Sequence, residues 1–199
     1  MKLLSIDASG KTAACSVTQN GELIAKRFCA SGLTHSQTLL PMISDMLSEA
    51  KIDIDDIDEF ALTIGPGSFT GLRIGAATVM GLANQRKCRC VSTLTAIAYN
   101  FADKNAIVIP ALDARRSQVY TAVFKCENGV VTQLECDDAQ SVENTFKKIT
   151  EYANTNTVII AGDGAYLFND LLCETKNVVF AKDEQLYAQG ASIAKAAQN

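Results

Sequence analysis

Residues 3–7 read Leu-Leu-Ser-Ile-Asp, and residues 106–113 read Ala-Ile-Val-Ile-Pro-Ala-Leu-Asp; each is a short apolar run that ends in a carboxylate. Runs of this length and composition are typical of buried β-strands. Each is followed, at 20–21 and at 128–129, by an Asn-Gly pair that separates two further strand-like segments. Asn-Gly is the strongest short-range signal for a β-hairpin. The chain therefore shows the same three-strand pattern twice.

The repeat continues beyond the two hairpins. In each half, apolar residues at helical spacing come next, and a second buried strand follows them. The segments are a helix at 36–50 and a strand at 60–64 in the first half, and a helix at 141–152 and a strand at 157–161 in the second. Similar spacing of unlike features indicates a duplicated unit.

A glycine-containing turn closes each of these strands, at 65–67 and at 162–164. In the first half, a helix to about residue 86 and another near 94–101 come after that turn. The order predicts an α/β protein with two duplicated βββαβα lobes, which is the arrangement of the actin-like ATPase (ASKHA) fold. We expect an N-terminal lobe over 1–103, which would carry the partner interface, and a C-terminal lobe over 104–199.

Composition and net charge exclude several classes of protein. The 199 residues are 48% apolar with a net charge of −4 and a pI of about 5.0, which excludes a disordered chain and disfavours a protein that holds a nucleic acid alone. No apolar run approaches the roughly 18 residues of a membrane span, and the amino terminus reaches Asp7 before a signal-peptide core forms. We expect a cytoplasmic protein with no membrane partner.

The seven cysteines predict reduced thiols without disulfides. Five lie mostly in apolar stretches, where they would pack as small hydrophobic residues: Cys15, Cys29, Cys126, Cys136 and Cys173. The Cys88-Arg89-Cys90 pair lacks the second pair that a zinc ribbon needs, so we interpret it as strand packing. The single histidine, His35, excludes a multi-histidine metal site and is interpreted as a surface or capping residue. No metal site is predicted.

The stretch from Gly65 to Gly71 permits two interpretations. Its glycines and the helix after them suit a phosphate-binding loop, but the lysine of a P-loop is missing. We favour a tight type II turn formed by Pro66 and Gly67, with Ser68 or Thr70 capping the helix.

A vestigial nucleotide cleft is the other candidate site. A carboxylate at the end of a strand either binds a metal-nucleotide or serves in a turn, and both interpretations stay open. The residues of this candidate cofactor site are Asp7, Ser9, Gly65, Gly67 and Asp113.

Two helices of the first half carry more apolar surface than one sheet needs. At about 100° per residue, the helix from Leu72 has apolar residues on two opposite sides, and the helix at 36–50 has a wide apolar arc. Such helices must be covered on both sides, either by each other or by another subunit. The predicted partner interface comprises Leu39, Met42, Ile43, Met46, Leu72, Ala76, Val79, Met80 and Ala83.

Several motifs resemble those of the TsaB (YeaZ) family. The most specific is Ile-Gly-Pro-Gly-Ser-Phe-Thr-Gly-Leu-Arg-Ile-Gly at 64–75. The others are Leu-Ser-Ile-Asp-Ala-Ser at 4–9, Thr-His-Ser-Gln-Thr-Leu-Leu-Pro at 34–41, and Asp-Ala-Arg at 113–115 with Val-Tyr at 119–120. The resemblance is strong to about residue 125 and faint beyond it.

The resemblance implies a non-catalytic partner of TsaD, the subunit that, with the ATPase TsaE, transfers a threonylcarbamoyl group to N6 of adenosine 37 in tRNAs that read ANN codons. It implies a homodimer in isolation, contact with tRNA only through the complex, and no required cofactor, although it leaves room for weak ATP or ADP binding. The two histidines of the TsaD metal motif fall on Thr93 and Ile97, neither of which can replace an imidazole. No catalytic residue is therefore assigned.

An autonomous enzyme is the alternative. Asp7, Asp113 and the two glycine-rich turns would suit a nucleotide-binding phosphotransferase or a hydrolase of the actin-like superfamily.

Overall fold

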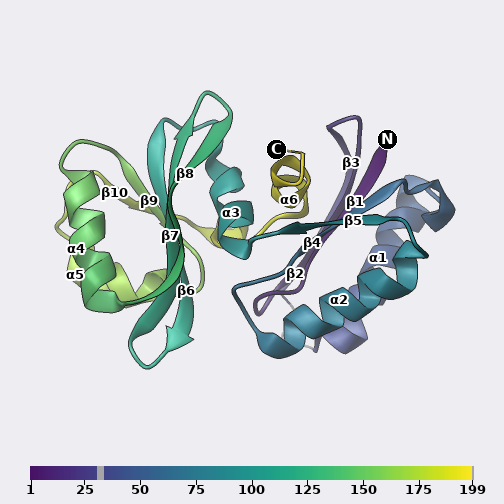
Figure 1. The fold of residues 1–199 in the computed structure, drawn as a ribbon, viewed down its shortest axis with the longest axis horizontal. Coiled ribbons are helices and arrows are strands. Elements are labelled where there is room, and N and C mark those ends of the chain that lie inside the picture. The colour runs from purple at the N-terminus through teal and green to yellow at the C-terminus, as the bar shows by residue number, and fades with distance from the viewer. Residues whose placement is uncertain (31–33, 199) are drawn as a thin grey trace. The chain divides into compact units, whose positions relative to one another are not determined.

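The computed structural model describes residues 1–30 and 34–198, which form two compact units (Figure 1). Unit 1 comprises Met1–Ala96 and Ala188–Asn199, and unit 2 comprises Ile97–Tyr187. The expected boundary between 103 and 104 therefore differs from the structure, above all because the carboxyl-terminal segment belongs to unit 1.

Unit 1 is built on a mixed five-stranded sheet with the order β3-β2-β1-β4-β5. Its first three strands are antiparallel neighbours, whereas β1, β4 and β5 run parallel. The strands are β1 (Lys2–Asp7), β2 (Ala13–Gln19), β3 (Glu22–Cys29), β4 (Glu59–Thr63) and β5 (Lys87–Val91). Parallel strands end at the same edge of the sheet, so residues that follow β1 and β4 come together there.

Helices cover both faces of this sheet. α1 (His35–Ala50) and α2 (Phe69–Ala83) pack on one face, and α6 (Gly190–Ala196) lies on the other (Figure 1). α6 approaches closely because a Cβ on Gly190 would lie 2.7 Å from backbone and side-chain atoms of Cys15 and Ser16. The shorter elements are η1 (Ile54–Asp56) and α3 (Thr93–Ala98), which follows β5.

Unit 2 repeats the topology of unit 1. Its sheet has the order β10-β9-β6-β7-β8, so β6, β7 and β8 form the antiparallel part and β6, β9 and β10 the parallel part. The strands are β6 (Ala106–Arg115), β7 (Gln118–Glu127), β8 (Val130–Ser141), β9 (Val158–Ala161) and β10 (Val178–Phe180). The same strand order in both units confirms the duplication.

The remaining elements of unit 2 are shorter on average than those of unit 1. α4 (Val142–Ala153) covers one face of the sheet with a core that includes Ile149 and Phe168. The others are η2 (Tyr99–Phe101), η3 (Ala165–Phe168), α5 (Asn169–Leu172) and η4 (Asp183–Leu186). The sequence analysis did not predict β10, α5 or α6, and it ended β8 six residues too early.

Both Asn-Gly pairs form the predicted hairpin turns. Asn20 and Gly21 have φ values of 51° and 88°, and Asn128 and Gly129 have 52° and 82°. Two consecutive left-handed residues are the geometry of a type I′ turn, which matches the twist of the adjoining strands.

In the part of the chain that the structure describes, no helix has both the length and the apolar character needed to cross a membrane.

Candidate functional site

Asp7 lies at the carboxyl end of β1, beside the end of the parallel strand β4. Its side chain is 1% exposed, and its Oδ1 accepts hydrogen bonds from Thr63 Oγ1 at 2.5 Å, from Ser9 Oγ at 2.6 Å and from the Ser9 amide at 3.2 Å. Burial raises the pKa of Asp7 above its ordinary value, and the hydrogen bonds from Ser9 and Thr63 oppose that shift. The carboxyl group thus joins two strand ends inside unit 1.

The glycine-rich turn packs directly against this segment. The Ser68 amide donates to the Ser9 carbonyl at 2.6 Å, and a Cβ on Gly67 would lie 2.3 Å from that same oxygen. Ser68 also caps α2, because its Oγ accepts from the Gly71 amide at 3.3 Å. Two of the amides that a phosphate loop would offer to a ligand therefore bind the chain itself, which supports the structural-turn interpretation.

The geometry of the turn differs from the expected type II. The Gly65–Pro66 peptide bond is cis, and Gly67 has a φ of 157°, whereas a type II turn has a trans bond and a φ of about +80° at its third residue. The type II prediction is wrong, because the close approach of Gly67 to Ser9 sets the backbone here.

His35 connects the start of α1 to the loop after β1. Its Nε2–H donates to the Gly10 carbonyl at 2.8 Å, and a Cβ on Gly71 would lie 3.2 Å from the ring. The N-cap of α1 is Thr34. The ring is half-buried, so His35 positions a loop and neither caps the helix nor lies free on the surface.

Unit 2 places Asp113 in a related setting. The Asp113 carboxylate accepts from the Arg115 amide at 2.7 Å and from the Tyr166 hydroxyl at 3.3 Å, while its amide donates to Asp163 Oδ1 at 3.1 Å. Gly162, in the turn after β9, packs against β6, where a Cβ would lie 2.1 Å from the Ala111 carbonyl oxygen. Of the predicted cofactor residues, Asp7, Ser9 and Gly67 come together in unit 1, and Asp113 belongs to unit 2.

The exposed side of α2 carries two large apolar side chains. Phe69 is 74% exposed and Met80 is 80% exposed; 11 residues at 100° each place them within about 20° of each other around the helix. Arg73 lies between them, with its guanidinium carbon 5.3 Å from the Phe69 ring centroid, and Ala77 is also exposed. We call Phe69, Arg73, Ala77 and Met80 the α2 stripe.

Most of the predicted interface residues do not belong to this stripe. Six of the nine are buried within unit 1: Leu39, Met42, Ile43, Met46, Val79 and Ala83. Leu72 and Ala76 are half-buried, and Met80 alone of the nine is exposed. The prediction that these six side chains are available to a partner is wrong, because α1 and α2 pack on the sheet and contact each other. The apolar sides of the two helices therefore belong to the core of unit 1.

The predicted interface omits two large exposed apolar residues of α1 and α2, Leu40 on α1 and Phe69 in the stripe. The exposure of Phe69 could have been predicted from its position. An aromatic residue at the first position of a helix, just after a capping serine, has no preceding helical turn to cover it.

Thr93 and Ile97, which occupy the two positions of the expected histidine motif, are buried. Thr93 and Ile97 lie at the start and within α3, and both are almost fully covered. A hydroxyl and a branched alkyl side chain there supply packing, not metal ligands.

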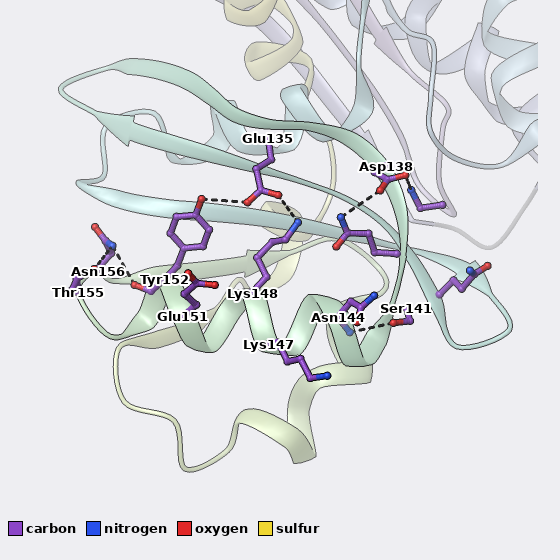
Figure 2. Close-up of a pocket in the computed structure, with 13 residues that line it drawn as sticks. Glu135, Asp138, Ser141, Asn144, Lys147, Lys148, Glu151, Tyr152, Thr155 and Asn156 are labelled. Carbon is purple, nitrogen blue, oxygen red and sulfur yellow. Dashed lines mark hydrogen bonds and ion pairs between the residues drawn. The ribbon is translucent and has the colours of Figure 1, made fainter.

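A groove of about 900 Å³ in unit 2 lies between β8 and α4 (Figure 2). Two of its charged groups pair with each other: Lys148 donates to Glu135, and the Tyr152 hydroxyl donates to the same carboxylate at 3.3 Å. None of the predicted site residues lines it. We assign it no function.

A family model described as TsaD, tRNA N6-adenosine threonylcarbamoyltransferase, matches residues 30–199. The chain is 30% identical over 153 residues to the tRNA threonylcarbamoyladenosine biosynthesis protein TsaB of Bacillus subtilis, which covers 76% of this chain and 67% of that protein. It is 38% identical over 136 residues to the TsaB protein of Escherichia coli, covering 65% of this chain and 58% of the relative. The match thus spans between half and about two thirds of these relatives.

Solved structures show the same fold. A Pseudomonas aeruginosa protein with similarity to the peptidase YEAZ superposes with a TM-score of 0.81 at 25% identity, over 99% of this chain and 90% of that one. Component A of (R)-2-hydroxyglutaryl-CoA dehydratase from Acidaminococcus fermentans, with 16% identity and a TM-score of 0.55, covers 99% of this chain and 96% of its own. The expected actin-like ATPase fold is confirmed.

Proposed function

Because this chain belongs to the TsaB (YeaZ) family and so has a role in tRNA threonylcarbamoyladenosine biosynthesis, we propose that it is a non-catalytic scaffold subunit. In this proposal it binds a TsaD-like catalytic subunit and activates it for threonylcarbamoyl transfer to N6 of adenosine 37 in ANN-decoding tRNAs. A TsaE-like ATPase completes the complex, and the isolated chain self-associates through the same surface.

The observation that carries the proposal is the α2 stripe. Phe69 and Met80 lie on one side of a helix whose opposite side is core. Covering a side chain of either kind contributes about 1.5–3 kcal/mol, and a few such anchors supply most of the binding free energy of an interface. The guanidinium of Arg73 beside Phe69 adds a donor for an acidic group on the partner.

The non-catalytic role is supported by what the candidate residues already do. Asp7 is buried and accepts three hydrogen bonds from Ser9 and Thr63. Thr93 and Ile97 stand where a TsaD-type protein would carry metal-binding histidines. The proposal therefore assigns this chain no cofactor of its own.

Contact with tRNA is proposed to occur only through the complex. The chain has 18 Lys and Arg against 22 Asp and Glu, and this negative net charge disfavours binding of a polyanion by the chain alone.

The test is Met80→Glu, compared with Val130→Glu. Val130 is also an exposed apolar residue, at 61%, but it lies in unit 2. We expect Met80→Glu to weaken binding to the TsaD-like subunit by roughly tenfold or more, because a charge would be desolvated in the interface, and to lower t6A formation in the reconstituted reaction. Val130→Glu should leave both unchanged.

Retention of wild-type binding and of t6A yield by a folded Met80→Glu variant would overturn the assignment of the interface. A purified chain that hydrolyses ATP, and loses that activity on Asp7→Ala, would overturn the non-catalytic role in favour of the enzyme alternative.

A further inference from the structure

The Cys88-Arg89-Cys90 segment forms most of β5, an edge strand of the unit 1 sheet. The sequence analysis interpreted its two thiols as strand packing, but both side chains are exposed. The position of the strand accounts for this exposure, because an edge strand is paired on one side only and its side chains are less covered than those of a central strand.

Both thiols point to the same side of the sheet. Cys88 is paired with Phe60 and Cys90 with Leu62, and these two partners face the core beneath α1 and α2. Residues at i and i+2 of a strand share a face. The two sulfur atoms are therefore neighbours on one exposed edge.

Arg89, between them, holds the strand from the opposite face. Its Nε donates to Glu59 Oε2 at 2.5 Å, and its Nη1 donates to the Ala197 carbonyl at 3.0 Å. Because this side chain is anchored to β4 and to the residue after α6, the backbone that carries both thiols is fixed before any ligand arrives.

The spacing suits a bridging ion better than a disulfide. Two residues of a strand span about 6.5 Å between Cα atoms, at the upper limit of disulfide geometry, whose usual value is about 5.5–6 Å. Two metal–sulfur bonds in a line, each as long as a zinc–thiolate bond of about 2.3 Å, need sulfur atoms about 4.6 Å apart, which is shorter than the Cα separation of the two residues.

We propose that Cys88 and Cys90 form a two-coordinate site for a soft monovalent cation, Cu(I), bound as a bis-thiolate. Binding forms two Cu–S bonds and releases two thiol protons to solvent, with no change of oxidation state. Soft thiolate ligands select Cu(I), whereas Zn(II) requires four ligands. Among the described residues, no group of three or more His, Cys, Asp or Glu is placed to hold a metal, so the site offers two ligands and disfavours zinc.

Two negative sulfur atoms side by side repel each other, and a cation bound between them removes that repulsion. Because binding of the ion displaces thiol protons, the affinity should fall as the pH is lowered.

The experiment is an anaerobic titration of the full chain with Cu(I), in competition with a chromogenic Cu(I) chelator and with a phosphine reductant present. We expect one Cu(I) per chain and an unchanged monomer or dimer mass. Cys88→Ser and Cys90→Ser should each weaken binding by roughly 100-fold, because the second thiolate of a chelating pair acts at high effective concentration. The matched control is Cys136→Ser/Cys173→Ser, which removes two exposed cysteines that are far apart in sequence and should bind as the wild type does.

Three results would overturn the proposal. One is equal Cu(I) affinity of the wild type and the Cys88→Ser/Cys90→Ser variant, and another is equal competition by Zn(II). The third is a doubling of mass on copper addition that either single variant abolishes, because the ion would then bridge two chains.

Discussion

Val79 and Met80 are adjacent in α2, yet Val79 is 2% exposed in the core of unit 1 and Met80 is 80% exposed in the α2 stripe. One residue of helix rotation, about 100°, separates a side chain that stabilises the fold from one that is free to contact a partner.

Glutamate at these two positions should therefore act on different properties. Val79→Glu would bury a charge among Leu, Ile and Met side chains, and we expect a loss of at least about 3 kcal/mol in the free energy of unfolding. Met80→Glu should change it by less than about 0.5 kcal/mol. Urea denaturation of both variants measures the difference, and similar losses would show that Met80 is part of the core.

Gly71 and Gly81 offer a second comparison within α2. A Cβ on Gly71 would lie 2.1 Å from the Ala8 carbonyl oxygen, whereas nothing lies within 4 Å of a Cβ on Gly81. Alanine favours a helix interior over glycine by about 1 kcal/mol, so Gly81→Ala should stabilise the chain by up to that amount. Gly71→Ala should destabilise it by several kcal/mol, because α2 must move away from Ala8 in the segment after β1. Thermal unfolding of the two variants gives the sign of each effect.

The raised pKa of Asp7 predicts that the free energy of unfolding depends on pH. Its pKa is raised in the folded state by burial, so the folded state holds this proton more tightly than the unfolded state does. The contribution of Asp7 to the free energy of unfolding is therefore greatest at low pH. It decreases as the pH rises through the pKa that Asp7 has in the folded state. Asp7→Asn keeps an oxygen that can accept from Ser9 and Thr63 but cannot ionise. We expect its stability relative to the wild type to be higher at pH 7.5 than at pH 4.5.

The measurement is urea denaturation of wild type and Asp7→Asn at both pH values. A relative stability of the variant that decreases with rising pH would contradict the raised pKa and indicate a carboxylate stabilised by its hydrogen bonds.

Arg86 should tolerate no conservative replacement. Its guanidinium donates to the carbonyls of Leu82 and Ala83 at the end of α2, and to those of Ile54 and Ile57 in the connection between α1 and β4, at 2.6–3.0 Å. A lysine lacks this planar fork. We expect Arg86→Lys to cost about 2 kcal/mol in the free energy of unfolding, because partly buried carbonyls lose their donors.

Arg116→Lys is the matched control for that loss. Arg116 is exposed in the turn between β6 and β7, and its replacement should be neutral within about 0.5 kcal/mol. Equal stability of Arg86→Lys and the wild type in chemical denaturation would refute the anchoring role of Arg86.

The sequence by itself determined the architecture. Strand-ending carboxylates at Asp7 and Asp113, Asn-Gly turns at two matching places, and helical spacing after each hairpin are local signals, and each depends on conformational preferences of a few neighbouring residues. They were sufficient to predict the duplicated lobes and the capped helix after Gly67. They did not predict α6, because its placement in unit 1 depends on contacts with Cys15 and Ser16, more than 170 residues away in the chain.

Only the tertiary structure decided which apolar side chains are available to a partner. Periodicity shows that a helix has two apolar sides, but burial depends on which elements cover each side, and α1 and α2 cover each other. Met42 and Val79 are consequently core, whereas Phe69 and Met80 remain exposed. The same reason holds for Cys88 and Cys90: a strand pattern is identical at the centre and at the edge of a sheet, and the exposure of these thiols depends on a neighbour that β5 does not have.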